Sequence, residues 1–345
     1  MPRTLTAGEL NRALLARQML LERRAVGLPK ALERMAGLQA QYAPSMYVGL
    51  WTRVRDLDRA AVTRALEQRR VVQATLMRAT IHLVSRADYW PLELAVRDAR
   101  RDWAMRVMTG APSARRMRTV AARARSLLAD GPLSRAELEA ELGKPEFRLL
   151  GMWLDLVRVP PSGTWERRRA DLLGLAEWWA GAPPEGCDEA TGTVLLVKRY
   201  LAAFGPATRH EVADFCGLSL ERVDAALGAV DLRAFRAEDG ADLVDLPRAP
   251  LPPADTPAPV RFLPTWDATL LVHARRTQIL PERHRGRIFN TRMPQSVGTF
   301  LVDGAVAGAW RPRDGRVEIE PFEQLTRAQR REVDAEAERL LGFLV

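Results

Sequence analysis

The sequence predicts a mainly α-helical α+β protein with β wings: three tandem winged-helix units and a C-terminal elaboration rich in β-hairpins. Two observations predict this fold. A helix-starting motif occurs twice, and each copy is followed by a helix-turn-helix pattern and then by a hairpin pattern. The chain of 345 residues is also longer than one ordinary domain of roughly 100–200 residues.

The repeated motif is Gly131–Leu138 in the first copy and Gly205–Val212 in the second. In both copies Gly-Pro ends the preceding helix, Ser134 or Thr208 fits an N-cap, and a glutamate three positions later completes a capping box. The expected helices are Val120–Ala129, Arg135–Leu142 and Glu146–Val157, and then Thr193–Phe204, Arg209–Phe215 and Leu220–Ala229. Three helices with a tight turn before the third form a helix-turn-helix.

A wing is expected after the third helix of each copy. In the first copy the wing strands are Val157–Pro161 and Gly163–Arg167. In the second copy Leu232–Arg236 and Asp242–Leu246 flank an Asp-Gly pair, which favours a tight hairpin turn. The helix-turn-helix and the hairpin together predict a winged helix.

The N-terminal part fits the same pattern. Its expected elements are helices Leu10–Arg24, Pro29–Leu38 and Asp58–Arg69, strands Val71–Met77 and Ala79–Val84, and a long helix from Arg86 to Met108. The sequence therefore predicts units at residues 1–112, 113–187 and 188–345, the last including the C-terminal extension. A proline-rich segment, Pro247–Pro259, leads into that extension. Its expected elements are strands Val260–Leu263, Thr299–Val302, Ala305–Trp310 and Val317–Ile319, and a helix Arg327–Phe343.

The formal net charge of +9 favours a polyanionic partner, and we expect double-stranded DNA. Lysine supplies only three of the 52 basic residues, which is typical of a GC-rich genome, so the position of the charge is more informative than its sum. Arginines gather at residues 97–125, on helical sequence that a solvated helix face also explains. They gather again at residues 273–292, where loop arginines can reach phosphates or a minor groove.

The cellular compartment is predicted from three features that the sequence lacks: a signal peptide, a membrane span and a disulfide framework. Met1–Leu20 has no continuous apolar core of the kind found in a signal peptide, and no apolar run approaches the roughly 20 residues of a membrane span. Cys187 and Cys216 do not make a disulfide framework. We expect a monomer in the cytoplasm, associated with the nucleoid, without membrane contact.

Common catalytic motifs for ester or phosphate hydrolysis do not occur in this sequence. The unusual segment is Gln39-Ala40-Gln41, which lies between two expected helices and just before Pro44. Two glutamines at an interhelical joint can serve for local capping alone. His82 likewise fits a hydrogen-bonded structural histidine as well as a functional one.

Four segments resemble, in order, motifs of the AlkZ-type winged-helix DNA glycosylases within the AlkZ/YcaQ family. Gln39-Ala40-Gln41 resembles the Gln-x-Gln motif, and Arg78–Leu83 resembles Arg-x-Thr-Leu-His. Leu263–Asp267 resembles Leu-Pro-x-x-Asp, and Val302–Trp310 resembles a late Val-Asp-Gly-x-x-x-Gly-x-Trp hairpin. The resemblance extends over nearly the whole chain and agrees with three winged helices. Two conservative departures are Ile81 for the usual Leu and Ala309 for the usual Thr.

The resemblance implies a monofunctional glycosylase that excises N-alkylated purines, including bulky or crosslinking N7-guanine adducts, without a cofactor or a metal. The Gln-x-Gln form is similar to the branch associated with self-resistance to DNA-alkylating natural products. Gln39 and Gln41 would hold a water at C1′ and stabilise an oxocarbenium-like transition state. A Schiff-base step needs an activated lysine, and Lys30, the lysine nearest the glutamines, is expected to be an exposed helical residue.

The expected DNA-binding residues are Arg78, Thr80, His82, His273, Arg275, Arg276, Arg287 and Arg311. The alternative function is a winged-helix transcriptional regulator without catalytic activity, and a further one is an architectural array. A regulator needs a basic recognition helix. The expected third helix of the last unit, Leu220–Ala229, carries Arg222 against Glu221 and Asp224, which argues against major-groove readout.

Overall fold

The computed structural model describes residues 2–271, 277–289 and 297–345, and it contains the same winged-helix order three times. Each unit has a helix, a short strand or bridge, two helices and a two-stranded wing. In the first unit these are α2 (Leu28–Arg34), β2 (Leu38–Gln39), α3 (Ala43–Trp51), α4 (Arg59–Glu67), β3 (Val71–Thr75) and β4 (Ile81–Ser85). The predicted fold class, mainly helical with β wings, is confirmed.

The two sequence repeats occupy equivalent positions in the second and third units. The second unit has α6 (Ala114–Leu127), β5 (Leu133–Ser134), α7 (Arg135–Leu142), α8 (Lys144–Leu150), β6 (Leu156–Arg158) and β7 (Leu172–Leu175). The third has α10 (Glu189–Phe204), α11 (Arg209–Cys216), α12 (Leu220–Gly228), β8 (Arg233–Ala237) and β9 (Asp242–Asp245). Ser134 and Thr208 both form the expected capping boxes, at the start of α7 and of α11.

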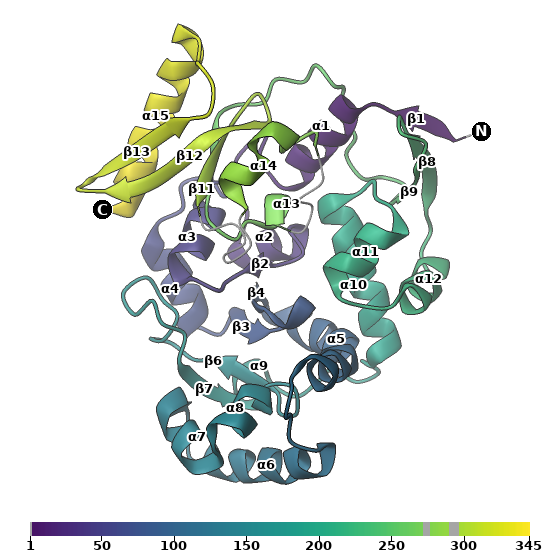
Figure 1. Cartoon of the computed structure of the whole chain (residues 1–345), viewed down its shortest axis with the longest axis vertical. Helices are drawn as coiled ribbons and strands as arrows, with labels where there is room; N and C mark the ends of the chain where they lie inside the picture. The colour runs from purple at the N-terminus through teal and green to yellow at the C-terminus, as the bar shows by residue number, and fades with distance from the viewer. Residues whose placement is uncertain (1, 272–276, 290–296) are drawn as a thin grey trace.

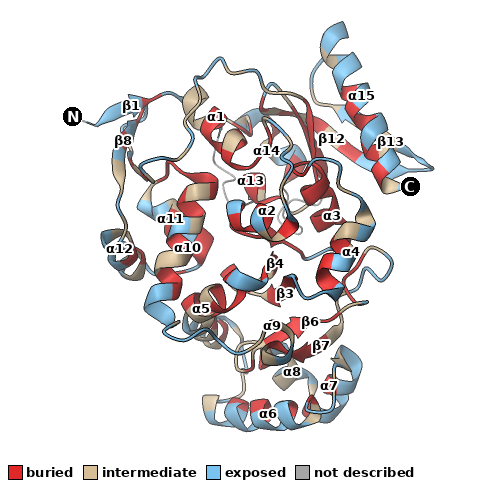
Figure 2. Cartoon of the chain, turned by 180° about the vertical axis from the view of Figure 1, so that it is seen from behind, coloured by how far each residue is buried: buried red, intermediate tan, exposed pale blue. Residues whose placement is uncertain are grey.

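The first unit lies at the centre of the molecule, and the other parts surround it (Figure 1). The long helix α5 (Arg86–Val107) follows the first wing and packs along α10 of the third unit. The second unit lies at the bottom of the view and the third at the right, while the C-terminal sheet lies at the upper left. Buried residues are concentrated in the central elements, whereas α6 and α7 are largely exposed (Figure 2).

The wings of the first and second units form one sheet. Its six strands follow the order β2-β4-β3-β6-β7-β5. The junction is the antiparallel pair β3–β6, in which Gln73 faces Arg158 and Ala74 faces Val157. These wings therefore pair with each other through backbone hydrogen bonds, which fixes the second unit against the first.

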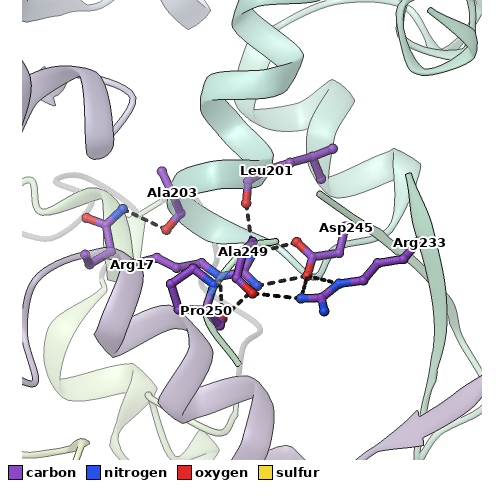
Figure 3. Close-up of polar contacts among 8 residues, drawn as sticks. Arg17, Leu201, Ala203, Arg233, Asp245, Ala249 and Pro250 are labelled. Atoms are coloured by element: carbon purple, nitrogen blue, oxygen red, sulfur yellow. Dashed lines mark hydrogen bonds and ion pairs between the residues drawn. The ribbon is translucent and has the colours of Figure 1, made fainter. Parts of the chain in front are cut away.

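The N-terminus belongs structurally to the third unit, which differs from the expected unit of residues 1–112. Strand β1 (Arg3–Leu5) pairs in parallel with β8. Helix α1 (Ala7–Arg17) then presents Arg17 to Asp245 of β9 in a bidentate ion pair with N–O distances of 2.7 and 2.9 Å. Both side chains are fully covered. Arg17 also donates to the backbone carbonyls of Leu201 and Pro250. Arg233 donates a further hydrogen bond to Asp245 (Figure 3).

The C-terminal part forms its own four-stranded sheet. The strands β10 (Arg261–Leu263), β11 (Gly298–Val302), β12 (Ala305–Arg313) and β13 (Arg316–Pro321) are antiparallel neighbours in that order. The remaining helices are α13 (Ala268–Leu271), α14 (Glu282–Ile288), α15 (Arg327–Leu344) and the short α9 (Ala176–Ala180) of the second unit. None of the helices in the described part of the chain is long and apolar enough to cross a membrane.

Several element ends differ from the sequence prediction, and local contacts explain them. Helix α2 ends at Arg34 rather than Leu38 because Ala36 and Gly37 adopt positive φ values and turn the chain into β2. Residues 163–167 form a loop rather than the second wing strand of their unit. The Ser162 hydroxyl accepts the backbone N–H groups of Asp171 and Leu172, at 2.7 and 3.0 Å, and closes this loop before β7 begins.

Candidate active site

Gln39 and Gln41 lie on the short connection between α2 and α3, at an edge of the six-stranded sheet. Gln39 is the last residue of β2 and faces His82 of β4. The backbone N–H of Ala40 continues the pairing by donating to the Ile81 carbonyl at 2.7 Å. Gly37 makes the entry turn possible: its φ is +78°, and a Cβ there would lie 2.9 Å from the Val84 side chain.

The amide oxygens of both glutamines reach the same short segment of the first wing. The Gln39 oxygen accepts from Arg78 Nη2 at 3.4 Å, and the Gln41 oxygen accepts from the backbone N–H of Ile81 at 2.8 Å. Gln41 is exposed, whereas Gln39 is only 5% exposed. A carbonyl oxygen has two lone pairs, so each amide oxygen can accept one further hydrogen bond beyond the contact it makes here.

Arg78 connects the third unit to Gln39. It lies in η1 (Met77–Ala79), where Arg78 and Ala79 have φ values of 53° and 55°, a conformation that costs energy for residues other than glycine. The Arg78 guanidinium donates to the Phe215 carbonyl and lies 5.0 Å from the centre of the Phe215 ring. Burial lowers the pKa of Arg78 to about 10, so the side chain is still a cation at neutral pH.

His82 is a neutral, covered residue of the sheet. It is 2% exposed, and its Nδ1 donates to the Thr80 carbonyl at 3.0 Å. Burial, with a further contribution from Arg78, lowers the pKa of His82 to about 3. The expectation that His82 contacts DNA is inconsistent with this position, because a covered imidazole cannot reach a phosphate or a base edge. Thr80 is half-buried, and its hydroxyl donates to the Met77 carbonyl.

The lowered pKa of His82 should make stability depend on pH. The folded protein protonates His82 near pH 3, while an unfolded chain does so near the ordinary value of 6.5. Between these values the unfolded state binds more protons, so the free energy of unfolding should fall as the pH falls from 7 towards 4. We expect His82→Asn to show a shallower dependence in urea unfolding followed by circular dichroism. Parallel curves for the two proteins would contradict this assignment.

The other expected DNA-binding residues lie in the C-terminal part, away from the glutamine connection in sequence. Arg287 is exposed on α14, 4.9 Å from the centre of the Phe322 ring. Arg311 is exposed on β12 and forms an ion pair with Glu318. His273, Arg275 and Arg276 lie outside the described residues. The structure therefore brings Arg78, Thr80 and His82 together with Gln39 and Gln41. Arg311 lines the same cleft as Tyr42, the residue after Gln41.

The two C-terminal motifs, Leu263–Asp267 and Val302–Trp310, are held by hydrogen bonds inside the fold. Asp267 is buried and accepts from Arg53 Nη2 at 2.9 Å and from the Thr269 hydroxyl at 2.7 Å. The Trp310 indole N–H donates to the Leu263 carbonyl at 2.8 Å and thereby joins the motifs. Gly308 is required by close packing, because a Cβ there would lie 2.3 Å from the Phe300 ring.

Two clefts lie beside the glutamine connection: Arg78, which contacts Gln39, lines one, and Tyr42, which follows Gln41, lines the other. The sequence predicted neither. One, of about 940 Å³, is lined by Arg78, Arg100, Trp103 and Arg222, among others. The other, of about 670 Å³, begins at Tyr42, the residue after Gln41, and includes Trp165 and Arg168. Tyr42 follows the motif directly, and Trp310 and Arg311 were singled out in the sequence, but no sequence signal places Trp165 and Arg168 beside them.

The described residues contain no group of three or more His, Cys, Asp or Glu side chains that could hold a metal ion.

Comparisons with known proteins agree with the arrangement of these elements. A family model described as DNA glycosylase AlkZ-like matches residues 32–343. Among solved structures, the chain is similar to the Streptomyces sahachiroi DNA glycosylase AlkZ, with a TM-score of 0.82 and 18% sequence identity. That match covers 99% of this chain and 97% of the other. A search of curated protein sequences found no match.

Proposed function

Because the chain belongs to the AlkZ-like DNA glycosylase family and is therefore a DNA glycosylase, we propose that it excises N-alkylated purines as a monofunctional enzyme. The substrates are N7-alkylguanines, including bulky and crosslinking adducts, and water attacks C1′. The observation that carries this proposal is that the amide oxygens of Gln39 and Gln41 both accept a hydrogen bond from the segment of residues 78–81. Two such acceptors can bind the two hydrogens of one water molecule.

A water bound by both amide oxygens would have the orientation that the reaction needs. When both of its hydrogens are accepted by amide oxygens, a lone pair of the water oxygen is left to face C1′. The negative ends of the amide dipoles also stabilise the positive charge that develops on an oxocarbenium-like sugar. Amides are too weakly basic to act as a general base. The reaction therefore depends on an N7-alkylguanine that is already cationic and leaves without a general acid.

Arg78 acts in this scheme as a positioning residue rather than as a phosphate contact. Its guanidinium is held by the Phe215 carbonyl and ring, and it donates to the oxygen of Gln39. This contact orients the Gln39 amide and leaves one lone pair of its oxygen available. The third unit therefore helps to position the Gln39 amide, because Phe215 holds the arginine that contacts it.

A base-release assay tests the proposal. We expect the protein to release N7-methylguanine from a duplex and to leave an intact abasic strand that breaks only after alkaline treatment. Strand cleavage without alkali would indicate a lyase step, for which an amine nucleophile is needed. Lys30, the lysine closest in sequence to the glutamines, is paired with Glu33 at 2.7 Å. Failure to release any base above the spontaneous rate would refute the proposal.

DNA binding should depend on the arginine-rich segment before β11. We expect the combined change of Arg275, Arg276 and Arg287 to glutamine to weaken duplex binding. The log-log slope of affinity against salt should fall by roughly one unit per lost phosphate contact. Fluorescence anisotropy over a salt series measures this slope. Arg236→Gln, which removes an exposed arginine paired with Asp242 on the third wing, is the matched control. An unchanged slope in the triple variant would place the DNA surface elsewhere.

The transcriptional-regulator alternative finds no support in the third unit. Arg222 of α12 turns towards α5 and donates to the Ala95 carbonyl at 2.9 Å, and it also pairs with Glu189. Asp224 of the same helix pairs with Arg209. Arg222 is the one basic residue of α12 and is engaged within the protein, so the helix does not present a basic surface for reading base edges.

A further inference from the structure

The cleft that begins at Tyr42 is built by three separate parts of the chain. Tyr42 and Ser45 come from the start of α3, Trp165 and Arg168 from the loop between β6 and β7, and Trp310 from β12. Its volume is about 670 Å³, and its lining is mostly apolar. Pockets of roughly 300–1,000 Å³ with apolar and aromatic walls are typical binding sites for small organic groups.

Contacts between these parts fix the shape of the cleft. Arg168 Nη1 donates to the Tyr42 hydroxyl at 3.3 Å, so the first unit and the loop of the second hold each other. The Trp165 ring packs edge-on against Tyr47, with centroids 5.6 Å apart. The hydroxyls of Ser45 and Thr265 are hydrogen-bonded at 2.6 Å. The cleft is thus formed before any ligand binds.

Tyr42 presents an aromatic ring to this cleft. The residue is 44% exposed, although it is large and apolar. Aromatic faces stack on planar ring systems, and this contact is tolerant of the precise identity of the ring. A planar aromatic group is therefore the ligand class that fits the exposed ring of Tyr42.

The position of the cleft relates it to the reaction proposed above. Tyr42 directly follows Gln41, so their Cα atoms are about 3.8 Å apart. A bulky group attached to N7 extends outward from the edge of the base, so in a purine bound at the glutamines it can reach the neighbouring cleft. A methyl group is close in size to one water molecule, whose share of liquid volume is about 30 Å³. It would leave a cleft of about 670 Å³ almost empty.

We propose that this cleft binds the aromatic substituent of a bulky N7-guanine adduct, and that Tyr42 favours such adducts over N7-methylguanine. The inference rests on the proposed glycosylase function at Gln39 and Gln41. It adds a specificity determinant in which the ring of Tyr42 stacks on the substituent. Arg168 supports the stack by holding the tyrosine hydroxyl.

The test uses two duplexes of the same sequence, one with N7-methylguanine and the other with N7-(1-pyrenylmethyl)guanine. The measured quantity is the ratio of kcat/KM for the pyrenyl adduct to that for the methyl adduct, after subtraction of spontaneous release. We expect Tyr42→Ala to lower this ratio on the order of ten-fold or more, the size of one lost stacking contact. Tyr42→Phe keeps the ring and loses only the hydroxyl contact with Arg168, so its ratio should stay much closer to the wild-type value than that of Tyr42→Ala.

A matched control is Trp178→Ala, which removes an exposed aromatic ring on α9 that is not part of the cleft. It should leave the ratio at the wild-type value. Equal losses on both substrates in Tyr42→Ala would mean that Tyr42 supports the reacting centre rather than selectivity, and would overturn the inference. Wild-type kcat/KM on both substrates in Tyr42→Ala would overturn it as well.

Pyrene fluorescence separates this inference from the proposed function. Binding of the pyrenyl duplex should quench pyrene emission in the wild-type protein and much less in Tyr42→Ala, whether or not base is released. If the wild-type protein releases neither base but shows this difference in quenching, the glycosylase proposal fails and the cleft assignment stands. Equal quenching in the two proteins rejects the cleft assignment.

Discussion

Changing Gln39 and Gln41 together to alanine should nearly abolish base release while DNA binding survives. A donor or acceptor that acts on the transition state of such a reaction contributes on the order of 10²–10³ in rate. Neither glutamine carries a charge, so the electrostatic part of DNA affinity should remain. The measurements are single-turnover release of N7-methylguanine and anisotropy binding to the same duplex.

The single variants are expected to differ in how clearly they report on catalysis. Gln41 is exposed and its oxygen accepts from a backbone N–H, so Gln41→Ala should change little besides the water site. Gln39 is nearly covered and contacts Arg78, so Gln39→Ala also removes a partner of the arginine. Gln68→Ala, at an exposed glutamine after α4, is the control and should keep the wild-type rate. Wild-type release by the double variant would show that the glutamines are not catalytic.

Asp245→Asn should be among the most destabilising substitutions in the protein. Asp245 accepts from both Arg17 and Arg233, and its side chain and that of Arg17 are fully covered. Removal of one partner of a buried ion pair leaves a buried charge uncompensated, which typically costs about 3–5 kcal/mol. Urea unfolding at neutral pH measures this loss, and a fall in Tm reports it if the variant is only marginally folded.

Asp242→Asn is the matched control for that change. Asp242 lies on the same strand, β9, but is exposed and pairs with the exposed Arg236. Exposed ion pairs contribute about 0–1 kcal/mol, so this variant should unfold close to the wild-type midpoint. Similar losses in the two variants would mean that the strand, rather than the buried pair, is responsible.

The helix-turn-helix repeats could be predicted from local sequence because their signals are local. Ser134 and Thr208 form capping boxes with residues only three positions away, and the structure confirms both. The long helix from Arg86 was predicted nearly to its end because Ser85 caps it and its sequence is strongly helical. Capping, turn residues and hydrophobic period depend on neighbours along the chain.

The candidate site was predicted only in part. The sequence indicated that Gln39 and Gln41 lie on a joint between helices, and the motif resemblance drew attention to them. It also grouped Arg78 and His82 with DNA-contacting residues. The structure instead places Arg78 against Phe215 of the third unit and His82 inside the sheet. Whether a residue is buried depends on which distant segments pack over it, and the residues next to it in the sequence do not determine those segments.

The sequence by itself therefore determined most of the segments that become helices and wings, and it singled out the motif at residues 39–41. Only the tertiary structure decided that β3 pairs with β6, that Arg17 reaches Asp245, and that Tyr42, Arg168 and Trp310 surround one cleft. Each of these contacts joins residues far apart in the chain. Their free energy comes from burial, ion pairing and hydrogen bonds that exist only once the units pack together.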